Sequence, residues 1–448
     1  MNILGLNINH ADTSACLVVD GNVRFAIEEE RFTRIKHYSE FPINSINACL
    51  ENSNLELRNV DYVCVNYNPK SNFLAKSIYM SKNLFTLNGI KKLINFRKKL
   101  FIDSDLSNFL KKNHFGGEFI NVEHHLSHIA SSYLVSGFDS AIGLSIDGFG
   151  DFTSTASFVC NKNEIKNIKS VIFPHSLGIL YQSITQFLGF KNYGDEYKVM
   201  GLASYGKPTY KKKFSEIISY NDKNYFKLNL KYFSHHNNPN FSFKFENGIP
   251  YFDNLFNDNF YSLFGEIFRS NRISQEHYNL ASTLQNVFEE IVLKILTNLH
   301  DEYKIDNLCL AGGCALNSKF NGIILKKTNF KKVFIQPNAG DGGGSLGASI
   351  YISSQKDKQY KNSTFDNAYL GTSYSNDYIK KNIIEKKLPN HDFKYQYLEN
   401  NDLNFFICNK LINSGIIGWF KGKCEWGPRA LGNRSILADP RNPKIKDI

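Results

Sequence analysis

Residues 3–27 read ILGLNINHADTSACLVVDGNVRFAI, and residues 141–160 read AIGLSIDGFGDFTSTASFVC. In both stretches an apolar segment leads into a short polar loop, and a second apolar segment follows the loop. Short apolar segments bounded by Asp, Asn and Gly are typical of paired β-strands. We therefore expect strands at residues 3–8, 15–20, 23–27, 141–146 and 154–160.

A third stretch, NLCLAGGCALN at residues 307–317, predicts a strand, a glycine turn and a helix that begins near Ala315. It follows a segment from Leu280 onward in which apolar residues recur with the 3.6-residue period of a helix. A glycine turn before a helix N-terminus can hold phosphate groups, although it is also an ordinary tight turn. The two hairpins and this element resemble the superfamily of acetate kinase, sugar kinases, Hsp70 and actin. That resemblance implies an α/β fold with two RNase H-like lobes.

Composition indicates the domain boundaries. Residues 210–258 are rich in Lys, Asn, Phe and Tyr and contain FSFKF before an Asn-Gly pair, which predicts an insertion with a β-hairpin. This insertion covers the active site or shapes the acceptor pocket, and a plain surface excursion is the alternative. A polar, Lys-rich linker is expected at residues 351–367. The predicted domains are therefore residues 1–354 and a smaller α/β unit at residues 368–448.

Charge and composition narrow the class of protein. The chain carries 53 Lys and Arg against 42 Asp and Glu, a net charge of +11. Part of the excess lies at residues 91–112, which predict either a solvated pair of amphipathic helices or a surface that contacts RNA. The first residues have no signal-peptide pattern and no apolar run reaches about 18 residues, so we expect a cytoplasmic protein without a membrane partner. The eight cysteines form no CxxC pair and predict free, mostly buried thiols.

The segment EHHLSH at residues 123–128 contains two histidines four positions apart. On a helix His124 and His128 share a face, so both imidazoles can reach one metal ion. Asp341 in NAGDGGG is the expected carboxylate ligand, because the glycines after it permit a close approach. The alternative is that the histidines cap or line a core. Asp147, at the end of an expected buried strand, either orients a reacting group or forms a turn.

A dense cationic segment, GWFKGKCEWGPRALGNRSI, occupies residues 418–436. Arginine binds phosphate oxygens with a bidentate fork, and here Lys423, Arg429 and Arg434 are interleaved with Gly, Trp and Pro. The segment predicts an anion-binding loop, and exposed surface charge is the alternative.

Seven motifs occur in one order along the chain. They are HADTSA (10–15), EEERFTRIKH (28–37), HHLSHIASS (124–132), SIDGFGD (145–151), GDEYKVMGLASYG (194–206), LAGGCALN (310–317) and EWGPRALGNRSILADPR (425–441). In this order they resemble the nodulation-protein and cephamycin O-carbamoyltransferase family, which includes tobramycin carbamoyltransferase. The resemblance covers nearly the whole chain, and GDEYKVMGLASYG and GPRALGNRSILADPR are its longest and most specific parts.

The resemblance implies an enzyme that transfers the carbamoyl group of carbamoyl phosphate to a hydroxyl of a small molecule or sugar. In the family a YrdC-like domain makes carbamoyl adenylate from carbamoyl phosphate and ATP, for which Mg²⁺ is a companion ion. The N-terminal domain then holds this intermediate at a divalent metal, typically iron, for attack by the acceptor. The implied acceptor is a sugar, an antibiotic or a Nod-factor-like molecule, and nucleic acid is not an expected partner.

The resemblance also implies site residues. The metal ligands of the family match His124, His128 and Asp341. The catalytic positions match His10, Lys36 and Asp147. Positions that contact carbamoyl adenylate match Gly178, Asn317, Lys423, Arg429 and Arg434, the last three of them in the YrdC-like domain. The family usually has Arg where Lys423 stands.

Family members continue well beyond ADPR, whereas this sequence ends at Ile448. The YrdC-like domain is therefore expected to be incomplete and poor at ATP-dependent activation. The expected protein partner is a second copy of the chain, or another chain that supplies the missing segment. Two other functions fit parts of the pattern. One is a tRNA threonylcarbamoyl transferase-like enzyme, which shares the fold and the HxxxH pattern, and the other is a truncated, non-catalytic nucleotide-binding remnant.

Overall fold

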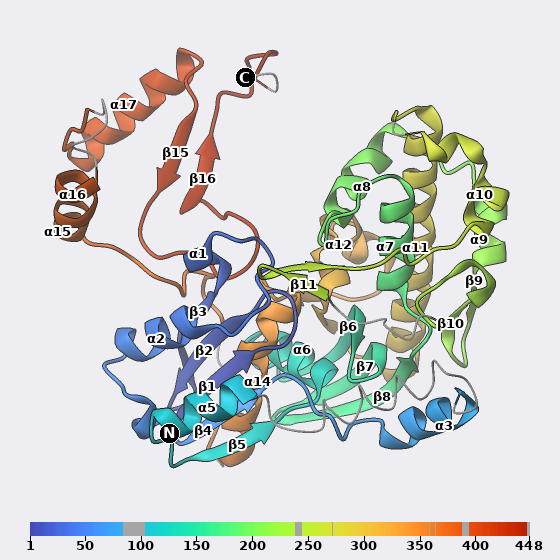
Figure 1. Cartoon of the computed structure of the whole chain (residues 1–448), viewed down its shortest axis with the longest axis horizontal. Coiled ribbons are helices and arrows are strands. Elements are labelled where there is room, and N and C mark those ends of the chain that lie inside the picture. The colour runs from blue at the N-terminus through green and yellow to red at the C-terminus, as the bar shows by residue number, and fades with distance from the viewer. Residues whose placement is uncertain are drawn as a thin grey trace. The chain divides into compact units, whose positions relative to one another are not determined.

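The computed structural model describes residues 1–83, 104–237, 244–270, 272–357, 359–362, 364–387 and 394–445. The chain forms two compact units, Met1–Asp366 and Asn367–Ile448, shown in Figure 1. Most of the basic stretch predicted at residues 91–112 lies outside the described residues, and its last part forms helix α5 (Ser104–Lys112). No helix among the described residues combines the length and apolar character that crossing a bilayer requires.

The first unit contains a five-stranded sheet built by the N-terminal third of the chain. Its strands are β1 (Asn2–Asn7), β2 (Ser14–Val19), β3 (Asn22–Glu28), β4 (Tyr62–Val65) and β5 (Glu118–Asn121). The strand order is β3-β2-β1-β4-β5. Strands β1, β2 and β3 pair antiparallel, whereas β4 and β5 run parallel to β1. The part of the unit built on this sheet is called lobe I, and its three predicted strands are confirmed.

A second sheet repeats this arrangement. Its strands are β6 (Ser140–Gly150), β7 (Thr153–Asn161), β8 (Glu164–Ile172), β13 (Asn307–Ala311) and β14 (Lys332–Ile335). The order is β14-β13-β6-β7-β8, with β6, β7 and β8 antiparallel and β13 and β14 parallel to β6. The part built on this sheet is called lobe II. The same mixed sheet used twice confirms the expected two-lobed α/β class.

Helices cover both sheets and run between them. They are α1 (Glu30–Thr33), α2 (Ile43–Asn52), η1 (Leu57–Asn59), α3 (Phe73–Asn83), α5, α6 (His124–Tyr133), α7 (Leu177–Phe187), α8 (Glu196–Leu202), η2 (Ala203–Tyr205), α9 (Lys211–Ile217), α10 (Asn259–Phe264), η4 (Glu266–Arg269), α11 (Gln275–Tyr303), η5 (Gly313–Leu316), α12 (Ser318–Asn321), α13 (Ile324–Lys327), η6 (Asp341–Gly343) and α14 (Gly344–Lys356). The predicted long helix is confirmed as α11, which begins five residues before Leu280 because Ser274 caps its first turn.

Helices α6 and α14 lie between the two sheets and pack against each other (Figure 1). The contact is close because it is made by residues with small side chains. A Cβ on Gly347 would lie 1.8 Å from the backbone oxygen of Ser127 in α6. On another face of α14, a Cβ on Gly5 of β1 would lie 1.9 Å from the backbone oxygen of Ser345. Only glycine permits backbones to approach this closely. The two helices therefore hold a fixed separation at the centre of the unit.

The predicted insertion is built from short elements. It contains β9 (Ile218–Asn221), β10 (Tyr225–Leu228), η3 (Leu230–Tyr232), β11 (Lys244–Glu246) and β12 (Ile249–Tyr251). Strands β11 and β12 form the predicted hairpin around Asn247 and Gly248, although the first three residues of FSFKF lie outside the described residues. This hairpin is a two-stranded sheet of its own.

The second unit contains α15 (Asn376–Ile379), the π-helix η7 (Lys380–Ile384), α16 (Glu385–Lys387), α17 (Asn400–Ile412), β15 (Ile417–Phe420) and β16 (Arg434–Leu437). Strands β15 and β16 pair antiparallel. Helix α17 buries none of its residues. The linker predicted from residue 351 begins too early, because α14 continues to Lys356 and the first unit to Asp366.

Gly347→Ala tests the contact between α6 and α14. The added Cβ meets a backbone oxygen that cannot move without displacing α6, so we expect the free energy of unfolding of the first unit to fall by at least about 2 kcal/mol. Urea unfolding followed by far-ultraviolet circular dichroism measures it. Gly201→Ala in α8 is the control, since no atom lies within 4 Å of its added Cβ. Equal stability of the two variants would show that the helix contact is not tight.

Candidate active site

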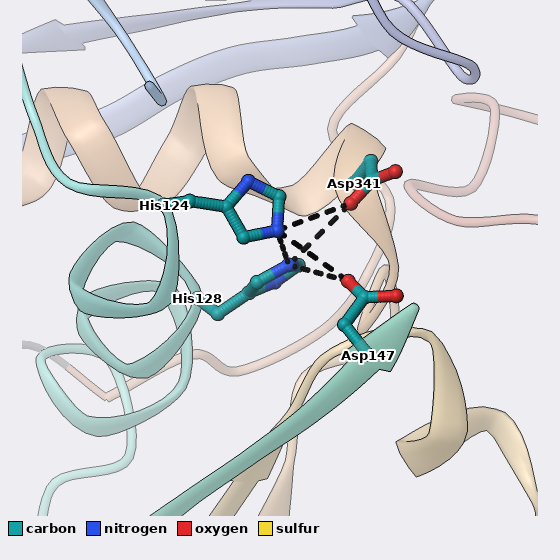
Figure 2. A group of neighbouring side chains, drawn as sticks. All are labelled: His124, His128, Asp147 and Asp341. Atoms are coloured by element: carbon teal, nitrogen blue, oxygen red, sulfur yellow. Dashed lines mark hydrogen bonds and ion pairs between the residues drawn. The ribbon is translucent and has the colours of Figure 1, made fainter. Parts of the chain in front are cut away.

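Four side chains converge between the lobes. They are His124, His128, Asp147 and Asp341 (Figure 2). His128 Nε2 lies 3.0 Å from both His124 Nε2 and Asp147 Oδ2. Asp341 Oδ1 lies 3.5 Å from each of the two Nε2 atoms. One donor atom from each residue falls within 4.8 Å of the other three, so the four atoms can surround one ion.

Helix α6 brings the two histidines together. The Glu123 side chain accepts a hydrogen bond from the backbone N–H of Leu126 at 2.7 Å and caps the helix. Asp151, in the hairpin after β6, accepts the backbone N–H of His124 at 2.9 Å and fixes the first turn against lobe II. His124 and His128 then project from successive turns of one face, as the sequence predicts.

The two carboxylates come from lobe II, and lobe I anchors one of them. Asp147 lies near the end of β6, and Asp341 opens the short helix η6 directly before α14. Ser14 of β2 donates a hydrogen bond to the backbone oxygen of Gly342 at 2.7 Å. The loop that carries Asp341 is therefore bonded to the first hairpin of lobe I.

The cluster is buried and strongly polarised. His128 is 0% exposed, and the side chains of His124, Asp341 and Asp147 are 5%, 4% and 15% exposed. Burial by itself would lower the pKa of His124, but Asp147 and Asp341 outweigh burial and raise it to about 9. Burial would raise the pKa of Asp147, but both histidines hold it well below its usual range. The lowered pKa values of Asp147 and Asp341 favour their ionised forms beside the histidines.

The third histidine of the motif has a different environment. His125 Nδ1 lies 2.7 Å from Ser145 Oγ, and the ring is 0% exposed. Burial, together with His124 and His128, lowers the pKa of His125 to about 3, so this imidazole is neutral. His125 therefore packs α6 against β6 and is not one of the four converging side chains.

Among the other predicted catalytic residues, His10 reaches the cluster and Lys36 does not. His10 Nδ1 is paired with Asp341 Oδ2. Lys36 is exposed, and its ammonium lies 5.1 Å from the centre of the Tyr197 ring. Its neighbour His37 is bonded through Nδ1 to Asp12 Oδ1 at 2.8 Å.

Gly178 and Asn317 each contact the backbone of a neighbouring segment. A Cβ on Gly178 would lie 2.7 Å from the backbone oxygen of Asp147, so this glycine lets α7 press against the end of β6. Asn317 caps α12 by accepting the N–H of Phe320 at 3.0 Å, and it exchanges two hydrogen bonds with Gln285. The helix predicted near Ala315 is therefore replaced by the 3₁₀ turn η5 followed by α12.

The three predicted anion-binding residues lie in the second unit and differ in their surroundings. Lys423 and Arg429 are exposed. Arg434 Nε donates to the Oε2 atom of Glu425 at 2.5 Å, and Glu425 is 0% exposed. Burial would raise the pKa of Glu425, but hydrogen bonds from Arg434, Leu431 and Asn433 outweigh it and lower the pKa to about 2. Arg434 therefore uses part of its guanidinium to hold the loop together.

Asp147 is predicted from the sequence as a catalytic residue and not as a metal ligand. An aspartate at the end of a strand gives no local sequence signal for the helix that it will contact. The contact of Asp147 with His128 depends on how β6 packs against α6.

A second polar group, Asp12, Glu30 and His37, also has donor atoms within 4.8 Å of one another. Its only sequence signal is its place in the motifs HADTSA and EEERFTRIKH.

The family model described as Carbamoyltransferase N-terminus matches residues 2–350, and the one described as Carbamoyltransferase C-terminus matches residues 408–448. The chain belongs to the carbamoyltransferase family. It is therefore a transferase.

Relatives with curated records extend the likeness. An uncharacterized protein of Synechocystis sp. is 34% identical over 100% of this chain and 72% of its own length. Nodulation protein NolNO of Sinorhizobium fredii is 31% identical over 97% of this chain and 59% of its own length. An uncharacterized protein of Methanocaldococcus jannaschii is 32% identical over 100% of this chain and 75% of its own length. This carbamoyltransferase chain thus spans 59% of NolNO and about three quarters of the other two relatives.

Solved structures show a more distant likeness. HypF of T. kodakarensis is 13% identical with a TM-score of 0.41, over 79% of this chain and 47% of that chain. Component A of the (R)-2-hydroxyglutaryl-CoA dehydratase of Acidaminococcus fermentans is 11% identical with a TM-score of 0.39, over 79% and 99%. The two-lobed fold of this carbamoyltransferase is defined by the two mixed five-stranded sheets of its own structure.

Arg434→Ala tests whether Glu425 holds the loop of the second unit. Removing the guanidinium leaves a buried carboxylate without its cation, so we expect a loss of about 3 kcal/mol in the free energy of unfolding of this unit. Because the pKa of Glu425 is lowered, the pair stabilises the unit above the ordinary glutamate range, and this contribution disappears as the pH falls toward 2.

The two tryptophans of the chain, Trp419 and Trp426, both lie in the second unit, so their fluorescence reports its unfolding alone. Lys423→Ala is the matched control, because it also removes a cation from the loop and its side chain is exposed. Equal midpoints for the two variants would contradict a structural role for Arg434.

Proposed function

We propose that this carbamoyltransferase moves the carbamoyl group of carbamoyl phosphate, activated by ATP as carbamoyl adenylate, to a hydroxyl of a small molecule or sugar. The observation that supports the proposal is the convergence of His124, His128, Asp147 and Asp341 on one buried point. Two imidazoles and two carboxylates are a donor set that suits Fe²⁺ or Zn²⁺. A site with ionised carboxylates and no lysine or arginine among its four members is suited to a divalent cation.

The residues fit a metal, and His124, His128, Asp147 and Asp341 would hold it. When bound, such an ion supplies a Lewis acid that stabilises negative charge on oxygen atoms of an activated carbamoyl group. His10 is bonded to Asp341 and orients this carboxylate from the side of lobe I. Gly178 keeps α7 pressed on the backbone of Asp147 and so fixes the second carboxylate.

In the proposed transfer step the acceptor oxygen forms a bond with the carbamoyl carbon. The bond between that carbon and the phosphate oxygen breaks, and the phosphate oxygen keeps the electron pair. The hydroxyl proton passes to a base at the site and reaches solvent when the products leave. The protein contributes mainly by holding both reactants in a site from which water is excluded. Lys423 and Arg429 in the second unit are the residues proposed to bind the phosphate groups during activation, with Mg²⁺ accompanying ATP.

Metal binding is the first test of this function. The purified chain, stripped of metal and titrated with Fe²⁺ under anaerobic conditions or with Zn²⁺, is expected to bind one equivalent by calorimetry. Asp341→Asn and His128→Ala are expected to weaken binding by at least about 100-fold, since each removes one ligand. The control is His114→Ala, because this histidine is exposed and does not belong to the cluster. Unchanged affinity in the cluster variants would refute the site.

Separate assays of the two half-reactions test the proposed division of labour. Arg429→Ala is expected to reduce pyrophosphate release from ATP and carbamoyl phosphate, and to leave transfer from supplied carbamoyl adenylate largely intact. Asp147→Asn is expected to do the reverse, because it lies in the first unit. Mass spectrometry of candidate sugars and aminoglycosides detects the carbamoyl mass increment. Equal loss of both half-reactions in either variant would contradict this division.

A further inference from the structure

The hairpin β11–β12 joins the two lobes at one small contact. Ser39 of lobe I donates two hydrogen bonds to the backbone oxygen of Gly248, from its N–H at 3.2 Å and from its hydroxyl at 2.9 Å. Gly248 has a φ of +79°, and a Cβ there would lie 2.6 Å from the ring of Tyr38. The glycine is therefore required for both the turn and the close approach.

This contact is connected to the metal cluster through lobe I. The backbone oxygen of Tyr38 accepts hydrogen bonds from the N–H of Thr13 at 2.9 Å and from its hydroxyl at 3.1 Å. Thr13 lies in the loop between β1 and β2, and His10 of the same loop is paired with Asp341. The contact of Gly248 with Ser39 and Tyr38 is called the seat of the hairpin. The seat and the cluster are both bonded to the short loop between β1 and β2.

A second connection runs through Tyr193 of lobe II. The Tyr193 ring lies 5.1 Å from the His37 ring and 6.0 Å from the ring of Phe252, the residue after β12. The Tyr193 side chain is half-buried, and its ring contacts join lobe I at His37 to the end of the hairpin at Phe252.

Little of the cluster is open to solvent in this arrangement, because its four side chains are at most 15% exposed. An acceptor molecule needs more room than this exposure leaves, so its entry requires a neighbouring element to move. The hairpin is the element suited to move, since its two three-residue strands pair with each other and not with either main sheet. A lone two-stranded hairpin is marginally stable, so its position depends on the seat at Ser39.

We propose that β11–β12 is a strap that closes the seam between the lobes over the cluster, and that its release from Tyr38 and Ser39 admits the acceptor and the metal. This inference deepens the proposed function and rests on it, because the strap has a role only if the cluster is the reactive centre. This role also accounts for the hydrogen bonds between Gly248, in an insertion of lobe II, and Ser39 of lobe I.

The test uses the full chain and the variant Gly248→Ala. The added methyl is disfavoured at φ +79° and meets Tyr38, so it weakens the seat. Gly265→Ala is the matched control, because its φ is +121° with no atom within 4 Å of the added Cβ, so it strains a positive-φ glycine outside the insertion without touching the contact at Ser39. Ser39→Ala removes one of the two hydrogen bonds and serves as a milder second variant.

Three measurements are made on each variant. They are hydrogen exchange at the Ser39 amide, nitration of Tyr193 in metal-free protein followed by mass spectrometry, and the rate at which bound Zn²⁺ is lost to a chelator. Gly248→Ala is expected to accelerate all three by about tenfold or more, and Ser39→Ala by about threefold to tenfold. Gly265→Ala is expected to leave them unchanged.

Faster exchange at Ser39 with unchanged nitration of Tyr193 and unchanged Zn²⁺ loss would overturn the strap, because the seat would then open without opening the site. Unchanged exchange in Gly248→Ala would overturn it as well. Failure of the unsubstituted chain to bind Zn²⁺ or Fe²⁺, with Tyr193 nitration still accelerated, would refute the metal centre of the proposed function and the entry of a metal, and would leave only the opening of the hairpin supported.

Discussion

The close contact between α6 and α14 is the constraint on which the rest of the first unit depends. Gly347 allows the backbone of α14 to approach Ser127 of α6, and no larger residue fits there. Helix α6 carries His124 and His128, and α14 follows directly after Asp341. The distance between the imidazoles and this carboxylate is therefore set by packing of helices, which resists small displacements better than a loop does.

The repeated sheet explains why polar loops meet at this contact. In lobe I the loop between β1 and β2 supplies His10, and in lobe II the equivalent end of β6 supplies Asp147. Each hairpin would be an ordinary surface turn in a protein with one such sheet. Because the two sheets lie on opposite sides of α6 and α14 (Figure 1), both turns bring a side chain to the same cluster, His10 to Asp341 and Asp147 to His128.

The sequence predicted the elements whose pattern is periodic, namely the strands of both hairpins and helix α11, because hydrophobic spacing is a local property. It also predicted that His124 and His128 share a helix face. It misplaced the helix after Gly313, because Asn317 caps a later helix, and it began the linker at residue 351, within α14. Pairings such as His37 with Asp12 and Arg434 with Glu425 depend on tertiary packing. No local pattern distinguishes such a pair from two solvated charges.

Stability does not account for the cluster of four polar side chains. Two buried carboxylates and two imidazoles cost desolvation energy that apolar side chains of similar volume avoid, and such replacements are often neutral or stabilising. His125 provides a comparison within the same helix turn. Its ring is equally buried, yet one bond to Ser145 and a lowered pKa leave it neutral. A buried histidine can therefore be accommodated here without carboxylates. Since Asp147 and Asp341 instead concentrate negative charge beside His124 and His128, the arrangement is suited to recruiting a cation rather than to filling the core.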